Sequence, residues 1–361
     1  MAANEMNLRR IQSALADGKF PAKALLLVSP VNRFFATGFP SSAGMVLITP
    51  NDCRMMTDFR YFEAAQKALP HIRLEMMQRG HRYADLVNAA LAELDVHELC
   101  YEDGETTVAD YNALKESIHA ELLPVGRQLA YLRAVKTEEE LDAMRGAQAA
   151  TDAAFEKILS DIHAGMTEKE IEARLIYHLY ACGGEKLSFD PIVVSGPNGS
   201  LPHGHAGDRQ VCRGDFITMD FGVIYKGYCS DMTRTVAVGS VSDEMREIYE
   251  IVLEAQSIGL REARAGRKWS EVDGAARSFI ASKGYGEYFG HGLGHSLGLE
   301  VHESLNYSAE TGDLTPENGV VSCEPGIYLP GKFGVRIEDC VILKKDGCEN
   351  LAKSKKNLLI L

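Results

Sequence analysis

The sequence has no apolar run that approaches the ~20 residues of a membrane-spanning helix, and its first ten residues lack the apolar core of a signal peptide. It also lacks a basic excess, because 51 acidic residues outnumber 38 basic ones and the net charge is −13. Nucleic acids and anionic membranes both require a basic surface, so neither is expected as a partner. No two of the eight cysteines have C-x-x-C spacing, and we expect reduced thiols in a soluble, cytoplasmic protein.

The length and the segment pattern indicate two domains. A chain of 361 residues exceeds the ~100–200 residues of a typical domain. The first third alternates short apolar runs with segments of helical spacing, which is typical of a small α/β domain. The character changes near residues 130–136, so we predict domains at 1–133 and 134–361. The predicted strands of the first domain are 24–28, 45–49 and 99–102, and its predicted helices are 59–69 and 81–94.

The second domain is predicted to contain the same succession of elements twice. Capping boxes at Thr137 and Thr167, each with a glutamate three residues later, begin two helices. A third helix is predicted over residues 243–265, and Ser270 is expected to cap a fourth. This order predicts a mixed α/β (α+β) fold with an internal duplication. The strand-like segments that follow each pair of helices are 192–195, 216–222 and 228–238, then 320–329 and 335–343.

Two aspartates mark the first candidate site. Asp220 and Asp231 lie on strand-like segments around the probable turn at residues 225–227. A symmetric hairpin would place them opposite each other, with Cα atoms ~4.5–5.5 Å apart. Carboxylates that close repel each other unless protons or cations lie between them, and hard divalent cations suit carboxylate oxygens. The alternative is a pair of surface aspartates on a loop.

Glu324 and Glu338 are related in the same way. They are centred on Gly331 in a second predicted hairpin, so two more carboxylates would face each other near its base. Arg336 shares a strand face with Glu338 and could orient that carboxylate or bind a substrate oxygen. Asp339 points to the opposite face, where a structural role is expected.

Histidines are concentrated between these hairpins. His291, His295 and His302 fall within twelve residues of a glycine-rich segment, which does not suit the helix of H-E-x-x-H zinc enzymes. His203 lies in a separate loop with His205, which could also take part in the site but is expected to be a solvated loop residue. A lone histidine is more often a core residue than a ligand, but three in one glycine-rich segment favour a site. The residues alone leave open which of the three binds a metal.

The motifs D-F-G, S-D-M-T-R-T, H-G-L-G-H-S-L-G-L-E-V-H-E, E-P-G-I-Y and V-R-I-E-D, in this order, resemble the pita-bread metallopeptidases. Within them the chain is similar to the Xaa-Pro aminopeptidase (aminopeptidase P) and prolidase group. The N-terminal motifs N-R-F, T-G-F and T-D-F-R-Y look like the creatinase-type domain of this group. The resemblance implies a creatinase-like α/β domain over 1–133 and a catalytic pita-bread domain with pseudo-twofold helix-helix-strand halves over 134–361.

The resemblance also implies a role for each candidate residue. Asp220 would bind one metal ion, and Asp231 and Glu338 would bridge two. His295 and Glu324 would complete the ligands, and Glu324 would also take a proton from the attacking water. Two divalent ions per chain are implied, with Mn²⁺ expected and Co²⁺ or Zn²⁺ as alternatives. The residues implied to contact substrate, to stabilise the tetrahedral intermediate or to lie beside the last ligand are His203, His291, His302 and Arg336.

The activity implied is hydrolysis of the bond between an N-terminal residue and a following proline, by a homodimer. Proline has no N–H and constrains the residue before it, so this bond requires a dedicated pocket. Two alternatives remain. An Xaa-Pro dipeptidase would accept only dipeptides and needs a group that captures the free carboxylate. A non-enzymatic pita-bread binding module would share the fold without the metal ligands.

Overall fold

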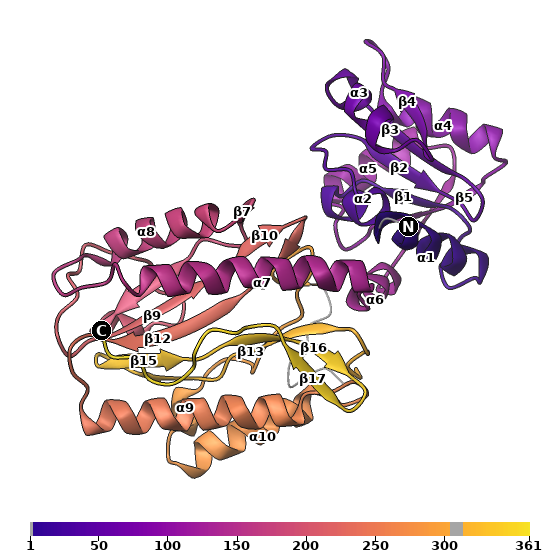
Figure 1. Ribbon diagram of the computed structural model, residues 1–361. Helices are drawn as coiled ribbons and strands as arrows, with labels where there is room; N and C mark the ends of the chain where they lie inside the picture. The colour runs from indigo at the N-terminus through magenta and orange to yellow at the C-terminus, as the bar shows by residue number, and fades with distance from the viewer. Residues whose placement is uncertain (1–2, 304–312) are drawn as a thin grey trace. The chain divides into compact units, whose positions relative to one another are not determined.

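The computed structural model describes residues 3–303 and 313–361, which form two compact units, Met1–Arg133 and Ala134–Leu361. Each unit mixes helices with strands (Figure 1). This confirms the α/β (α+β) fold class predicted from the sequence. None of the helices that the structure describes combines the length and the apolar character needed to cross a membrane.

The first unit is a mixed six-stranded sheet in the order β4-β3-β2-β1-β5-β6. Helices α4 and α5 pack on one face of it, through an apolar cluster that includes Val87, Leu114 and Leu26. The predicted elements of this unit are present within two residues at each end. Its strands are β1 (Leu25–Leu27), β2 (Met45–Ile48), β3 (Cys53–Thr57), β4 (Arg73–Met76), β5 (Glu98–Tyr101) and β6 (Glu121–Pro124), and its helices are α1 (Ala3–Ala16), α2 (Pro30–Thr37), α3 (Phe59–Ala68), α4 (Tyr83–Glu93) and α5 (Val108–Ser117), with α6 (Gln128–Ala134) at its end.

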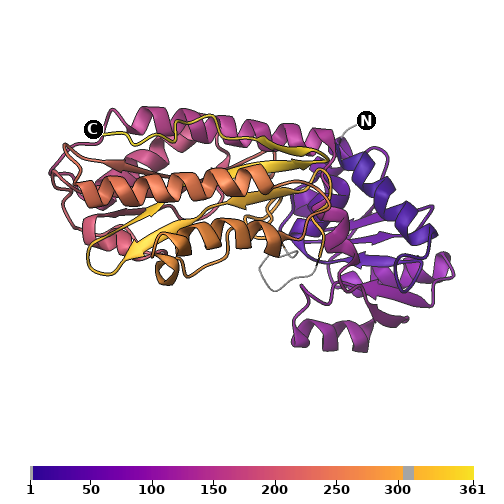
Figure 2. The same cartoon turned by 90° about the horizontal axis from the view of Figure 1, so that it is seen from below.

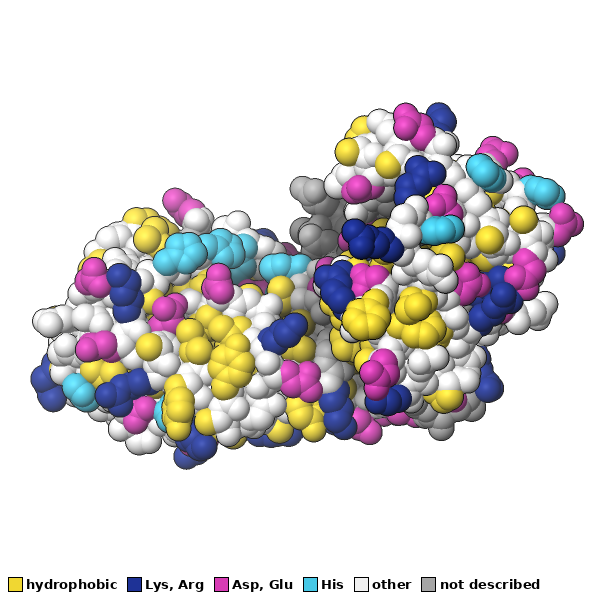
Figure 3. All heavy atoms as spheres, turned by 90° about the horizontal axis from the view of Figure 1, so that it is seen from above, with side chains coloured by type: hydrophobic (Ala, Val, Ile, Leu, Met, Phe, Trp, Pro, Cys, Tyr) yellow, Lys and Arg dark blue, Asp and Glu magenta, His cyan; other side chains and the backbone are white. Residues whose placement is uncertain are grey.

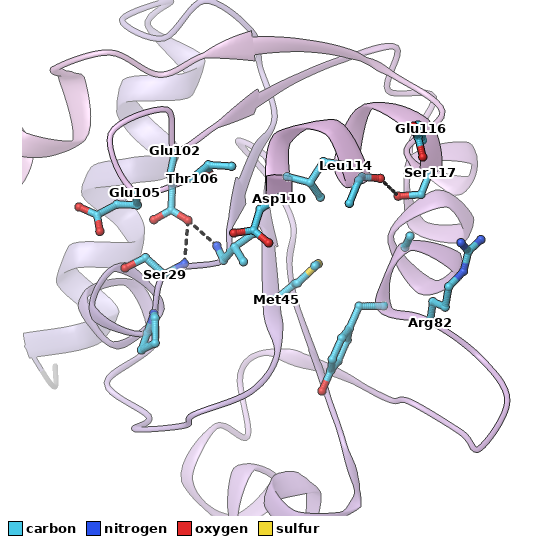
Figure 4. Close-up of a pocket in the computed structure, with 15 residues that line it drawn as sticks. Ser29, Met45, Arg82, Glu102, Glu105, Thr106, Asp110, Leu114, Glu116 and Ser117 are labelled. Atoms are coloured by element: carbon cyan, nitrogen blue, oxygen red, sulfur yellow. Dashed lines mark hydrogen bonds between the residues drawn. The ribbon is translucent and has the colours of Figure 1, made fainter. Parts of the chain in front are cut away.

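A cavity of about 670 Å³ lies in this first unit (Figure 4). Several carboxylates line it, but the buried Glu102 already accepts hydrogen bonds from the amides of Val28 and Ser29 and from the side chain of Asn32. Glu102 therefore anchors the loop after β1. Among the described residues of this unit no group of three His, Cys, Asp or Glu side chains converges as metal ligands would.

The second unit contains the predicted duplication. Two helices, α7 (Glu138–Ile158) and α8 (Glu168–Ala181), precede the first strands, and α9 (Asp243–Glu262) and α10 (Trp269–Ser282) precede the second set. The strands lie between the two helix pairs (Figures 1 and 2). The first set is β7 (Lys186–Leu187), β8 (Ile192–Ser195), β9 (Phe216–Phe221), β10 (Val223–Tyr225), β11 (Tyr228–Cys229) and β12 (Met232–Ala237), and the second is β13 (Val320–Cys323), β14 (Gly326–Leu329), β15 (Phe333–Arg336), β16 (Asp339–Lys344) and β17 (Gly347–Asn350).

Capping signals predicted two of the four helix starts, and α9 begins at Asp243, where the apolar spacing placed its start. The capping boxes at Thr137 and Thr167 are both present, with each threonine accepting a backbone N–H and each partner glutamate closing the box. Ser242 caps α9. The prediction that Ser270 caps α10 is wrong, because the helix begins at Trp269, with Lys268 at the cap position two residues before Ser270. The Trp269 side chain is fully buried, so core packing holds the first turn.

The first predicted hairpin has a different register from the symmetric one. Lys226 and Gly227 both have positive φ, 49° and 84°, and form a two-residue turn of the I′ kind. Strands β9 and β12 then pair with Asp220 opposite Thr233, so the prediction that Asp220 lies opposite Asp231 is wrong. Because side chains alternate with a period of two, a slip of two residues leaves both carboxylates on one face.

The second hairpin follows the predicted register. β13 pairs with β16, and β14 pairs with β15 in a separate small sheet, in the same antiparallel register, with Cys323 opposite Asp339. Glu324 therefore falls opposite Glu338, between the two pairs of strands. Asp339 points away from them, as predicted, into a fully buried ion pair with Arg234.

Candidate metal centre

Four carboxylates and one imidazole converge where the two halves of the second unit meet. Ligand atoms of Asp231, His295 and Glu338 all lie within 4.8 Å of one another. His295 Nε2 is 3.5 Å from Asp231 Oδ2 and 3.4 Å from Glu324 Oε1. Asp220, on β9, reaches the same place. All five predicted ligand residues line one cavity of about 480 Å³.

Asp231 and Glu338 are buried and Asp220 and Glu324 are half-buried, without enough positive charge nearby to balance the four carboxylates. Burial, followed by the charges of Asp220 and Glu324, raises the pKa of Asp231 well above its usual range. Burial, followed by the charge of Asp231, raises the pKa of Glu338 in the same way. Within the described residues, Asp220 Oδ1 and Asp231 Oδ1 are buried and receive no hydrogen bond. An unpaired buried oxygen is costly, and hard divalent cations coordinate such oxygens. The residues therefore fit metal ions.

We expect the affinity of this site for Mn²⁺ to fall as the pH is lowered. The raised pKa values of Asp231 and Glu338 mean that the metal-free site holds protons, which a cation must displace. Lower pH adds protons to these carboxylates and so weakens binding. Calorimetric titrations of chelator-treated protein, in buffers with different ionisation enthalpies, would count the released protons. Affinity that does not change with pH, with no proton release, would contradict the expectation.

Arg336 contacts Asp220, and not Glu338, which was one of its two predicted partners. Its Nη2 donates to Asp220 Oδ2 at 2.7 Å, so it orients Asp220 and not Glu338. Its Nε donates to Thr233 Oγ1 at 3.1 Å, and the Thr233 hydroxyl donates to Glu338 Oε2 at 2.6 Å. Sequence reasoning missed Thr233. It lies two residues after Asp231, on the same strand face, so the alternation of side chains could have identified it.

His291 is held by its neighbours. Its Nδ1 is 2.8 Å from the carbonyl oxygen of Gly292, which can only accept, so Nδ1 carries the hydrogen of the neutral ring. Its Nε2 then accepts from the hydroxyl of Tyr328 at 2.9 Å. Arg336 Nη1 donates to the same hydroxyl at 2.9 Å. Tyr328 was also missed, although it lies in the E-P-G-I-Y motif, because no local pattern indicates a contact with His291.

The other histidines surround the same cavity. His302 packs edge-on against His295, with ring centroids 4.3 Å apart. His203 and His205 both line the cavity, and both are exposed, as expected for loop residues. Histidine side chains gather at one edge of this unit in Figure 3. The apolar residues that line the cavity are Phe189, Ile192, Pro202 and Val301.

Comparisons with known proteins agree on one family. The model of metallopeptidase family M24 matches residues 142–345, and that of the creatinase/prolidase N-terminal domain matches residues 8–135. An Xaa-Pro dipeptidase of Pyrococcus furiosus is 34% identical, over 93% of this chain and 94% of the relative. The structure is similar to an Xaa-Pro dipeptidase from Bacillus anthracis, with a TM-score of 0.94 and 40% identity. The match covers 99% of this chain and 100% of that protein. It is also similar to an X-Pro aminopeptidase from Thermotoga maritima, with a TM-score of 0.91 and 36% identity. This match covers 96% of this chain and 99% of that protein.

Proposed function

This chain belongs to metallopeptidase family M24, with a creatinase-type domain before its pita-bread domain, and on that premise we propose that it is an Xaa-Pro aminopeptidase. The family makes it a metallo-exopeptidase, and its relatives act on Xaa-Pro bonds. We assign catalysis to residues 134–361 and the creatinase-like domain to residues 1–133. The expected manganese, homodimer and cytoplasmic location stay predictions.

Family M24 implies divalent metal ions. We assign their ligands to Asp220, Asp231, His295, Glu324 and Glu338, on the strength of the convergence of these side chains and the two unpaired carboxylate oxygens. Bound ions of this kind lower the pKa of water to near neutrality and polarise a carbonyl oxygen.

The residues of the chain divide the remaining work. Glu324 accepts a hydrogen bond from Ser322 Oγ at 3.0 Å, and in the proposal it takes the proton of the attacking water. Burial lowers the pKa of His302 and that of His291, so both imidazoles are neutral at pH 7 and each carries one N–H. His291 uses its N–H on Gly292, which leaves His203 and His302 to donate to the developing oxyanion, while His291 holds Tyr328.

The charge of the cavity wall favours an aminopeptidase over a dipeptidase. A dipeptide places a free carboxylate on the residue just after the scissile bond, and a buried carboxylate needs a cationic partner. Among the described residues that line the cavity, Arg336 is the one Lys or Arg, and it is already paired with Asp220. Residues 304–312 contain neither Lys nor Arg. In a longer peptide this carboxyl is an uncharged amide, and the cavity suits it better.

We therefore expect Ala-Pro-Ala to be cleaved with a higher kcat/KM than Ala-Pro. The metal-loaded protein would be assayed with both peptides, with release of alanine as the measure in each case. Ala-Ala-Ala serves as the control for the proline requirement. Cleavage of Ala-Pro alone would replace the proposal with an Xaa-Pro dipeptidase, the activity that the Bacillus anthracis and Pyrococcus furiosus proteins are named for.

The non-enzymatic alternative is tested by metal analysis of the purified protein. Stoichiometric metal, or activity that Mn²⁺ or Co²⁺ restores after chelation, supports the enzyme. Absence of both would favour a binding module.

A further inference from the structure

The loop that carries His203 is tied at both ends to one buried carboxylate. Glu168 is the first residue of α8 and is fully buried. Its Oε1 accepts from the amide of Ser195 at 2.7 Å and from the hydroxyl of Ser195 at 2.8 Å. Its Oε2 accepts from the amide of Gly207 at 3.0 Å. The side-chain amide of Asn198 donates to both oxygens. A single side chain thus fixes the beginning and the end of residues 195–207.

The same loop is also fixed from its other side. Gly199 and Gly334, on β15, pass so close that a Cβ on Gly334 would lie 2.0 Å from the carbonyl oxygen of Gly199. Strand β15 ends at Arg336, which holds Asp220. The loop is therefore clamped between α8 and the strand that leads into the metal centre.

The second half of the unit repeats this arrangement around His291. Asp273, on α10, is buried and accepts from the amide of Leu293 at 2.9 Å. It also forms a two-pronged ion pair with Arg277, at 2.8 and 2.9 Å. Arg277 donates to the carbonyl oxygens of Phe289 at 2.8 Å and His291 at 2.6 Å. The backbone is thus held on both sides of His291.

Neither anchor touches the cavity. Glu168, Asp273 and Arg277 are absent from its described lining, so they do not meet substrate or metal. Charge-assisted bonds to backbone groups are short and directional, and they fix a loop more firmly than neutral ones do. In both halves the second helix supplies a buried carboxylate that serves the loop bearing a site histidine.

We propose that Glu168 and the Asp273–Arg277 pair are positioning residues, which place His203 and the His291–Tyr328 pair for the reaction. The inference rests on the proposed peptidase function. A displacement of about 1 Å in a catalytic group can reduce a rate about a hundredfold. Loss of the Glu168 anchor therefore lowers kcat and leaves the metal content unchanged, because none of the proposed ligands lies in residues 195–207.

The first test is Glu168→Gln. It replaces one carboxylate oxygen with an NH₂ group, which cannot accept the hydrogen bond that a backbone amide now donates there. We expect kcat for Ala-Pro-Ala to fall about tenfold to a hundredfold, with unchanged metal content and little change in KM. The amides of Ser195 or Gly207 should exchange hydrogen faster. Glu170→Gln is the matched control, because Glu170 lies in the same helical turn and bonds only to Thr167 among its described hydrogen bonds. Glu168→Asp, which keeps the charge, should recover part of kcat.

A double-mutant cycle separates positioning from general stability. If Glu168 acts through His203, then Glu168→Gln lowers kcat no further in a His203→Ala background. In the same background Asp273→Asn should still lower it. Additive effects of Glu168→Gln and His203→Ala, or a Glu168→Gln variant with normal kcat, would overturn the proposal. So would a Glu168→Gln variant whose only change is a lower melting temperature.

Hydrogen exchange distinguishes failure of this inference from failure of the proposed function. If the wild-type protein cleaves no Xaa-Pro peptide, the function is wrong, whatever the variants do. Faster exchange at the amide of Ser195 or of Gly207 in Glu168→Gln would still support the anchor, and unchanged exchange at both would refute it.

Discussion

Replacing Asp231 with alanine is expected to remove stoichiometric metal binding and to lower kcat/KM for Ala-Pro-Ala by about a thousandfold or more. The carboxylate is buried, lies 3.5 Å from His295 and shares its surroundings with Glu338. In the proposed assignment it serves both ions, so its loss affects both. Metal ions contribute several kcal/mol to such reactions, and each ~1.4 kcal/mol is a factor of ten in rate.

Metal content by elemental analysis and steady-state kinetics would be measured on the same preparation. Asp208→Ala is the control, because Asp208 is an exposed aspartate whose ion pair with Lys169 lies at the surface. A melt of the metal-free Asp231→Ala protein checks that it is folded. Full metal content with full Xaa-Pro cleavage in this variant would show that the ligand assignment and the mechanism are wrong.

Replacing Asp339 with alanine is expected to lower the free energy of unfolding by about 3–5 kcal/mol, the usual cost of removing one partner of a buried ion pair. Asp339 is fully buried and accepts from Arg234 and from Lys356, each at 2.7 Å. Gln256 and Asn350 donate to it as well. Its loss leaves the buried guanidinium of Arg234 without a counter-charge.

The pH dependence of this contribution follows from the same contacts. Burial alone would raise the pKa of Asp339, but the charges of Arg234 and Lys356 lower it to about 2. This is below the ~3.9 of an unfolded aspartate, so the carboxylate stabilises the fold above about pH 4. The stabilisation is lost as the pH falls through about 2. Wild type and Asp339→Ala should therefore converge in stability in strong acid.

Urea unfolding would measure the difference in free energy of unfolding between wild type and Asp339→Ala. Both proteins would be metal-free, because bound metal adds its own stabilisation. Glu244→Ala provides the comparison, because Glu244 pairs with Lys332 at the surface and exposed pairs contribute little. A loss in Asp339→Ala no larger than that in Glu244→Ala would show that the buried network does not stabilise the fold.

Local sequence signals predicted the helices, and the reason is physical. A capping box is complete within four residues, so Thr137 and Thr167 indicate helix starts without knowledge of the rest of the fold. The register of the first hairpin was missed because it depends on the left-handed conformation of Lys226, a residue type that rarely adopts it. The error in register did not move Asp220 and Asp231 to opposite faces of the hairpin, because a slip of two residues keeps every side chain on its own face.

Long-range contacts could not be predicted in this way. Glu168 bonds to Gly207, 39 residues away, and Thr233 bonds to Glu338 across 105 residues. No periodicity or spacing within one sequence pairs such residues. The four candidate carboxylates were identified because each hairpin brings its own two together, whereas the choice of His295 as the fifth ligand rested on the family resemblance. The His291–Tyr328 contact and the anchors of the histidine loops became visible only in the folded structure, as did the bond from Thr233 to Glu338.

The division of the four carboxylates between the two halves has a consequence for the synthesis of the protein. Asp220 and Asp231 come from the first half of the duplication, and Glu324 and Glu338 come from the second, more than eighty residues later. A nascent chain that has emerged only as far as α10 carries one pair of these carboxylates and cannot offer the full set to a cation. With the proposed ligand set, metal capture would require both halves to be synthesised and docked, and a chain truncated before Glu338 would lack the complete set.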